Sequence, residues 1–261
     1  MKVLKFGGTS VANSESISKV ISILNSNQND NLLIVVSALG GITNLLQECL
    51  SLKGKSTENV LNKIEERHLE IINNLSNLDG QSSLKSFLKE KLNQLEDILD
   101  AISTIDEVTK KTLSKVLTLG ELLSSKIIYE ILVQKGFDID YVNSQDLIFT
   151  KEVNKKEVLD SEKSSKNIKN NLDLSKSKMM IAPGYICSDK SGEISNLGRG
   201  GSDFTAAIYA KYCNAKSLEI WTDVSGVFSA NPNIVKKALP IQFLSYKEAM
   251  ELSFFGAKVI Y

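Results

Sequence analysis

The 261-residue sequence predicts an α/β fold built around a mainly parallel sheet. Short, dense apolar runs such as residues 31–37 recur along the chain, and they are typical of strands buried on both faces. Several of these runs end in glycine turns that lead directly into amphipathic helices, which is the alternation that parallel sheets require. A chain of this length can hold one large α/β domain or two small ones.

Lys5 lies inside the first predicted strand, residues 3–6, where an ammonium is costly unless an anion meets it. Gly7 and Gly8 end the strand, and Thr9 follows before a predicted helix. Free backbone N–H groups and the dipole at a helix N-terminus attract anions, so these residues indicate a phosphate site. A core strand whose Lys5 extends its ammonium to solvent explains the same residues equally well.

The second predicted strand, residues 31–37, also ends in a glycine turn, and a helix over residues 14–25 would connect the two strands. In open α/β sheets ligands gather at the carboxyl ends of the strands, so the two turns should form one crevice. Ser37 and Thr43 lie in and just after the second turn. Thr43 is a candidate ligand, although a threonine that only begins a helix is an equally good explanation.

Residues 56–135 are expected to form three or four amphipathic helices that pack on the sheet. His68, the only histidine, lies in a charged stretch and is expected on the solvated face of its helix. A single histidine excludes metal sites that need two. Glu121 follows Gly120 between leucines on a helix that should be buried, so its carboxylate should meet a cation such as an amino group.

A strand is expected over residues 138–142 and a polar surface helix with loops over residues 151–178. A buried strand at 178–184 and a hairpin at 185–197 then lead to the densest motif, Gly198-Arg-Gly-Gly-Ser-Asp203. Arg199 offers a planar fork that suits a carboxylate, and Ser202 or Asp203 is expected to cap the following helix. A plain hairpin loop would explain the glycines but not the arginine and aspartate together.

The last clear strand, residues 217–224, carries Thr222 and Asp223 at its carboxyl end, where a Mg²⁺–nucleotide could lie. Ser245 and Glu248 form a capping-box pattern that opens a helix. Lys258 repeats the pattern of a lysine in an apolar run. The chain stops within that run, so we expect a longer protein.

The composition is that of an ordinary globular protein without preference for nucleic acid or anionic lipid. Basic and acidic residues balance at 31 each, and 42% of the residues are hydrophobic. No apolar stretch approaches the roughly 20 residues of a membrane span, and the N-terminus lacks the core of a signal peptide. Cys49, Cys187 and Cys213 are expected to be buried thiols in a reducing cytosol. We therefore expect a soluble, cytoplasmic protein.

Taken together, the motifs resemble the catalytic domain of the aspartokinases, in the amino-acid kinase superfamily, and most of all the N-terminal part of the bifunctional aspartokinase–homoserine dehydrogenases. The matching segments span the chain in the family's order: residues 5–10, 40–44, 120–121, 198–203, 221–224 and 248–259. The resemblance implies a three-layer αβα sandwich of the carbamate kinase-like type. It also implies one catalytic domain over 1–261, with a substrate lobe to about 180, a nucleotide lobe from about 181, and no regulatory ACT domain.

The resemblance implies transfer of the γ-phosphoryl group of ATP to the side-chain carboxylate of L-aspartate. The product is 4-phospho-L-aspartate, in the first step of lysine, threonine and methionine biosynthesis. Mg²⁺ would be held through the ATP phosphates with no direct protein ligand, and the full-length form would be a homo-oligomer such as a homodimer. The implied catalytic residues are Lys5 and Asp203. Those implied to bind aspartate are Ser37, Thr43, Glu121, Arg199 and Ser202, and those implied to bind the nucleotide are Lys5, Gly7, Gly8, Thr9, Thr222, Asp223, Phe228 and Lys258.

Two alternatives remain. The first is another kinase of the superfamily, acting on glutamate, acetylglutamate or a nucleoside monophosphate, although Glu121 with Arg199 favours a free amino acid. The second is a catalytically weak nucleotide-binding fragment. Asn231-Pro-Asn233 stands where the family usually has Asp-Pro-Arg. The family's arginine is expected near the phosphates, so its absence here would weaken the binding of ATP.

Overall fold

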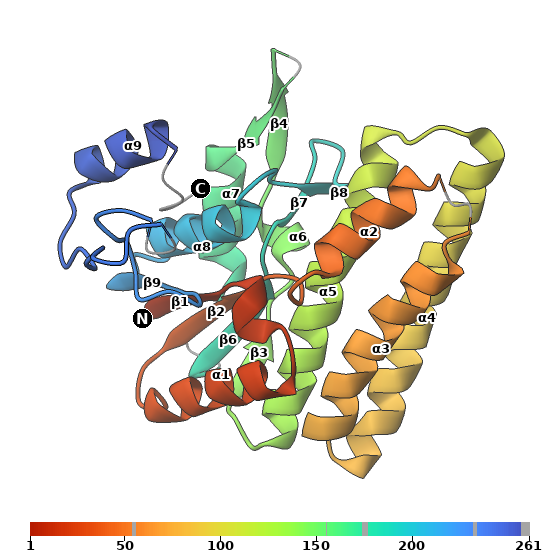
Figure 1. The fold of residues 1–261 in the computed structure, drawn as a ribbon, viewed down its shortest axis with the longest axis horizontal. Coiled ribbons are helices and arrows are strands. Elements are labelled where there is room, and N and C mark those ends of the chain that lie inside the picture. Colours follow the sequence, from red (N-terminus) through yellow and green to blue (C-terminus); the bar gives the residue numbers. More distant parts are fainter. Residues whose placement is uncertain (54–55, 155, 174–176, 232–233, 257–261) are drawn as a thin grey trace.

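The structure, a computed structural model, describes residues 1–53, 56–154, 156–173, 177–231 and 234–256. Its centre is a five-stranded sheet in the order β3-β6-β2-β1-β9, and every neighbouring pair in it is parallel (Figure 1). The strands of this sheet are β1 (Lys2–Phe6), β2 (Leu32–Val36), β3 (Ile139–Tyr141), β6 (Met179–Pro183) and β9 (Ser217–Trp221). Two antiparallel hairpins stand apart from it: β4 (Thr150–Val153) with β5 (Lys156–Leu159), and β7 (Ile186–Ser188) with β8 (Ile194–Asn196).

Helices cover both faces of the sheet, which makes three layers and confirms the predicted sandwich. On one face lie α1 (Ser14–Ser26), α2 (Ile42–Ser51) and α5 (Lys110–Gln134). The helices α3 (Glu58–Leu75) and α4 (Leu78–Ile105) pack against α2, α5 and each other, so of the helices expected to pack on the sheet within residues 56–135 only α5 lies directly on it. The other face packs against α6 (Ser144–Leu147), α7 (Ser161–Asn171) and α8 (Gly201–Tyr212). The remaining helix, α9 (Tyr246–Phe254), lies beyond the edge strand β9, at the opposite end of the molecule from α3 and α4 (Figure 1).

Alternating side chains of the strands explain why the sheet has two apolar faces. Leu4 and Phe6 belong to the core beneath α1–α5, whereas Val3 belongs to the core beneath α6–α8. Because successive residues of a strand point to opposite faces, Lys5 shares the face of Val3 and is directed toward α8. The register pairs Lys5 with Val35 of β2 and with Ile220 of β9, so it lies in the middle strand of three.

The expectation that His68 lies on a solvated helix face is wrong. The ring is completely buried, and its Nδ1 lies 2.7 Å from the carbonyl oxygen of Ile64. His68 follows Ile64 by four residues and precedes Ile72 by four, which places it on the apolar stripe of α3. Burial lowers the pKa of His68 to about 4, so the ring is neutral at physiological pH. The charged neighbours in the sequence hide this stripe.

A second difference concerns residues 150–159, within the stretch expected to form only a surface helix and loops. The described residues 150–153 and 156–159 pair as the β4–β5 hairpin, and their side chains are almost all exposed; the expected surface helix α7 follows. Cys49 and Cys187 are buried free thiols, as predicted, whereas Cys213 is a free thiol that is only half-buried. Within the described ranges, no helix has both the length and the apolar composition to cross a membrane.

Candidate active site

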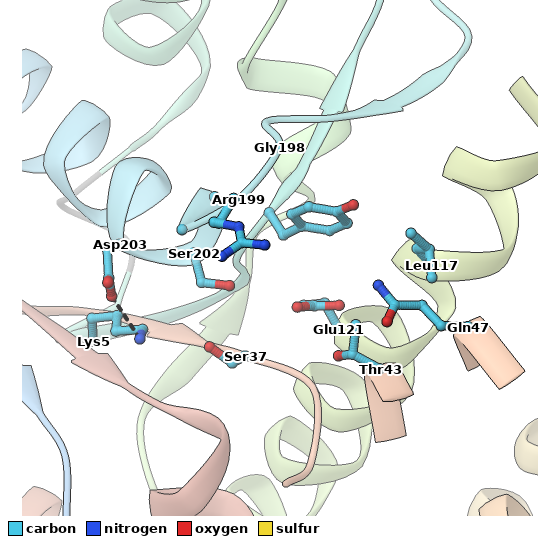
Figure 2. A pocket seen from close by; sticks show the side chains of 13 residues that line it. Lys5, Ser37, Thr43, Gln47, Leu117, Glu121, Gly198, Arg199, Ser202 and Asp203 are labelled. Atoms are coloured by element: carbon cyan, nitrogen blue, oxygen red, sulfur yellow. Dashed lines mark ion pairs between the residues drawn. The ribbon is translucent and has the colours of Figure 1, made fainter. Parts of the chain in front are cut away.

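A cavity of about 450 Å³ opens at the carboxyl ends of β1 and β2, between the two helical layers (Figure 2). Polar side chains and glycine backbone dominate its lining. The residues that line it are Lys5, Ser37, Thr43, Gln47, Leu117, Glu121, Tyr185, Gly198, Arg199, Gly200, Gly201, Ser202 and Asp203. Seven of the residues predicted to act in the site therefore meet around one space, although they come from segments up to 198 residues apart in the chain.

Lys5 does not extend to solvent but forms an ion pair at one side of the cavity. Its Nζ lies 2.6 Å from Oδ1 of Asp203, and both side chains are more than four-fifths buried. Asp203 lies in the first turn of α8, where the helix dipole favours a carboxylate. The anion that a lysine in a buried strand requires is therefore supplied from almost 200 residues away (Figure 2).

The N-terminus of α8 reaches the cavity because two glycines permit close backbone contact. A Cβ on Gly201 would lie 2.6 Å from Cδ2 of Tyr185, and one on Gly184 would lie 2.5 Å from Cβ of Ser202. The backbone N–H of Tyr185 also donates to Oγ1 of Thr205, at 2.9 Å. This packing holds the start of α8 against the turn that follows β6.

The helix cap differs from the prediction, which assigned it to Ser202 or Asp203. The N-cap of α8 is Gly200, in the left-handed conformation with φ +71°, and no side chain caps the helix. A glycine adopts this conformation without steric cost. As a result, Ser202 and Asp203 fall within the first turn, and their side chains line the cavity instead of closing the helix end.

Glu121 forms the opposite wall, from α5. Gly120 allows this helix to lie close to the turn after β2, since a Cβ at position 120 would be only 2.8 Å from the Cβ of Ala38. The Oγ of Ser124 also donates a hydrogen bond to the carbonyl of Ser37 in that turn, at 2.7 Å. Glu121 is 6% exposed, and its Oε2 has no hydrogen-bond partner among the described residues. Burial raises the pKa of Glu121 to about 8, against a smaller opposing effect of a hydrogen bond from the backbone of Ala38.

The glycine turn after β1 lies beside the turn after β2. A Cβ on Gly8 would be 3.1 Å from the carbonyl oxygen of Ala38, so the two backbones are in contact. Gly7 donates its N–H to the carbonyl of Trp221 at 3.2 Å, and the Trp221 ring stacks on Phe6 with centroids 6.1 Å apart. Thr9 is exposed in the same turn.

The other predicted nucleotide residues do not line the cavity. Thr222 and Asp223 are exposed immediately after β9, with Oγ1 of Thr222 donating to Oδ1 of Asp223 at 2.9 Å. Their position next to Trp221 places them near the Gly7 turn, outside the lining of the cavity. Phe228 is half-buried farther along, in a bridge with Pro240. Lys258 and Asn233 lie outside the described residues.

Three lining side chains were not predicted. Gln47 follows Thr43 by four residues on α2, and Leu117 precedes Glu121 by four on α5, so helical spacing from the predicted residues indicates both. Figure 2 shows Gln47 beside Thr43 and Glu121. Tyr185 has a φ of +67°, which is uncommon for a residue with a side chain, and no sequence pattern signals it.

The site combines charges suited to a zwitterionic acid and a second anion. An ammonium can pair with Glu121, a carboxylate with the exposed fork of Arg199, and a further anion with Lys5. Among the residues that the structure describes, no group of three or more histidine, cysteine, aspartate or glutamate side chains could hold a metal ion.

Comparison with known proteins shows which family the chain resembles. The model of the Amino acid kinase family matches residues 1–261. The chain is 34% identical to the bifunctional aspartokinase/homoserine dehydrogenase of Buchnera aphidicola, over 100% of the chain and 33% of that protein. It is also 34% identical to the aspartokinase of Chlamydia pneumoniae, over 99% of the chain and 56% of that protein.

A solved structure shares the fold. The crystal structure of E. coli aspartokinase III in complex with aspartate and ADP superimposes with a TM-score of 0.90 at 28% identity, covering 100% of this chain and 57% of that one. The chain thus spans about a third to just over half the length of the relatives it matches. With the family match covering every residue and the site built from its motifs, the chain belongs to the amino acid kinase family.

Proposed function

We propose that the protein is an aspartate kinase, which transfers the γ-phosphoryl group of ATP to the side-chain carboxylate of L-aspartate and so forms 4-phospho-L-aspartate. The observation that carries the proposal is the buried, unpartnered Oε2 of Glu121 in the same cavity as Arg199 and Lys5. A free α-amino acid supplies the ammonium that this carboxyl lacks. Similarity to aspartokinases over the whole chain supports the same substrate.

In this proposal the two ends of the amino acid are held by opposite walls of the cavity. Glu121 pairs with the α-ammonium and Arg199 with the α-carboxylate, because a guanidinium fork matches both carboxylate oxygens. The hydroxyl groups of Ser37, Thr43 and Ser202 complete the binding. The side-chain carboxylate is then directed toward Lys5.

The nucleotide is proposed to approach from the side of β9. Gly7, Gly8 and Thr9 offer backbone and hydroxyl donors to its phosphates, and Lys5, oriented by Asp203, neutralises charge on the transferring group. The remaining nucleotide contacts are assigned to Thr222, Asp223, Phe228 and Lys258. Mg²⁺ fits as a companion of the phosphates, where it supplies further charge neutralisation, because the described residues offer no metal-binding cluster of their own.

The chemistry needs no general base, since the aspartate side chain is already ionised. A carboxylate oxygen attacks the γ-phosphorus, the bond from that phosphorus to the β–γ bridging oxygen breaks, and ADP leaves. Phosphoryl transfer of this kind depends on alignment and charge stabilisation. A protein with one buried, neutral histidine can perform it.

We further propose that residues up to about 180 mainly bind the acceptor and those from about 181 mainly bind the nucleotide, with Arg199 and Ser202 reaching back to the acceptor. The proposal also places the protein in the cytoplasm, in the biosynthesis of lysine, threonine and methionine. Its full-length form is proposed to be a homo-oligomer.

The test is a coupled assay of ADP release with Mg-ATP and L-aspartate, in which hydroxylamine traps the acyl phosphate. We expect aspartate-dependent ADP release and a trapped hydroxamate, with little turnover on glutamate, N-acetylglutamate or a nucleoside monophosphate. Binding of ATP without any hydroxamate would refute the proposal. Faster turnover on another acceptor would reassign the substrate within the family.

A further inference from the structure

The chain uses arginine at only two positions. Of its 31 basic residues, Arg67 and Arg199 are arginines and the rest are lysines. Arg199 lines the cavity, where a planar fork suits a carboxylate. Arg67 is on α3, outside the cavity lining, and the proposed chemistry gives it no role. In a chain that otherwise uses lysine for positive charge, this position needs its own explanation.

Arg67 bridges the two turns that border the cavity. Its Nη2 donates to the carbonyl of Ala12 at 3.0 Å and to the carbonyl of Gly40 at 2.9 Å. Ala12 closes the short 3-10 turn Gly8–Val11 that follows β1, and Gly40 lies in the turn between β2 and α2. One nitrogen therefore holds two segments that are 28 residues apart in the chain.

The two turns touch where Arg67 joins them. A Cβ on Gly40 would lie 3.0 Å from Cβ of Ala12 and 3.1 Å from the carbonyl oxygen of Gly8, so their separation is set by backbone contact. One turn farther along α3, Glu70 accepts a hydrogen bond from Oγ of Ser14, which fixes the helix against the start of α1. The helix that carries Arg67 is thus fixed next to the two turns.

We propose that Arg67 is a positioning residue, which sets the spacing between the turn proposed to bind the phosphoryl donor and the turn proposed to bind the acceptor. This inference rests on the proposed function. Arg67 acts through two backbone carbonyls and touches neither substrate. Each turn keeps its own ligand contacts without Arg67, but the reacting atoms lose their alignment, on which phosphoryl transfer depends.

A lysine at this position cannot do the same. The ammonium of lysine ends one bond earlier than the Nη2 of arginine, so from the same Cα it falls short of two carbonyls that arginine already reaches at 2.9 and 3.0 Å. Arg67→Lys therefore keeps the charge and loses part of the bridge. Arg67→Met keeps the length of the aliphatic stem and loses all of the bridge.

The experiment compares Arg67→Met and Arg67→Lys with wild type and with the control Lys63→Met, which removes an exposed charge one turn earlier on the same helix. We measure kcat, both KM values, and amide exchange at Ser10 and Ile42. These amides donate within the first and second turn, at 3.0 and 2.9 Å. In Arg67→Met we expect kcat to fall roughly 10- to 100-fold with both KM values within about threefold of wild type. Exchange at both amides should rise at least about tenfold, and Arg67→Lys should lie between.

Several results would overturn the inference. If kcat of Arg67→Met falls only in proportion to the fraction of folded protein, Arg67 contributes to stability and not to alignment. If amide exchange at Ser10 or at Ile42 is unchanged in this variant, Arg67 does not hold both turns. An equal loss in Lys63→Met would assign the effect to charge on α3. If wild type itself shows no aspartate-dependent turnover, the proposed function fails. In that case amide exchange alone tests whether Arg67 bridges the two turns. Faster exchange at both Ser10 and Ile42 in Arg67→Met, and at neither amide in Lys63→Met, would support the bridge.

Discussion

Replacing Glu121 by glutamine should stabilise the unliganded protein at alkaline pH and weaken its hold on the amino-acid substrate. The carboxyl is 6% exposed, and its Oε2 has no hydrogen-bond partner among the described residues. Burial raises its pKa from 4.5 to about 8. Between these two values the folded protein keeps a proton that the unfolded chain has lost, so the free energy of unfolding falls as pH rises.

The size of the effect follows from the difference between the two pKa values. A gap of about 3.5 units, at about 1.36 kcal/mol per unit, sets a ceiling on the order of 5 kcal/mol for the stability lost between pH 4 and pH 9. Glutamine has a similar shape and no charge, so Glu121→Gln avoids this loss. The stability difference between variant and wild type should therefore be small at pH 5 and grow steadily toward pH 8.5.

Urea unfolding of both proteins at pH 5.0, 7.0 and 8.5 measures this difference. Glu66→Gln, at an exposed position of α3, serves as the control and should show no such trend. A stability difference for Glu121→Gln that is constant over this pH range would refute the reasoning, because it would mean that the carboxyl does not ionise differently in the folded and unfolded states.

The same reasoning predicts that substrate binding releases a proton. The α-ammonium of aspartate should favour the ionised form of Glu121, so KM for aspartate should fall as pH rises from 6 to 8. In Glu121→Gln this pH dependence should vanish and KM for aspartate should rise about 100-fold, while KM for ATP stays close to wild type. An equal rise in both KM values would contradict the assignment of Glu121 to the amino acid.

Three further substitutions test other parts of the site. Lys5→Met should lower kcat by about 100-fold or more by removing charge from the transferring group, and the assignment fails if turnover persists while circular dichroism confirms the fold. Arg199→Lys should raise KM for aspartate about tenfold, because an ammonium cannot form the two parallel bonds of a guanidinium; an unchanged KM would place the α-carboxylate elsewhere. Gly120→Ala introduces a methyl 2.8 Å from Cβ of Ala38 and should cost about 1–3 kcal/mol in urea unfolding; wild-type stability would mean that α5 can move away freely.

Much of the fold and half of the site could be predicted because the signals are local. Five consecutive apolar residues identify β2, and glycine turns at the ends of β1 and β2 place a crevice there. The cost of burying Lys5 and Glu121 predicts that each needs an opposite charge. Asp203 provides one for Lys5, and the Oε2 of Glu121 has no hydrogen-bond partner among the described residues.

The features that were missed depend on packing between distant segments. His68 is buried because α3 packs within a layer of helices, and the charges around it in sequence do not reveal that. The β4–β5 hairpin is exposed on both faces, so its residues show no alternation of polar and apolar side chains. Arg67 carries no motif, and its contacts with Ala12 and Gly40 exist only once three separate segments have come together.

The single tryptophan of the chain gives the site an optical sensor of its own. Trp221 stacks on Phe6, and its carbonyl accepts hydrogen bonds from the N–H of Gly7 and from Oγ of Ser10. The indole is also 36% exposed, so its emission responds to water as well as to its neighbours. A ligand that orders the turn after β1 acts directly on the surroundings of this fluorophore, and its arrival can be followed in real time without any label.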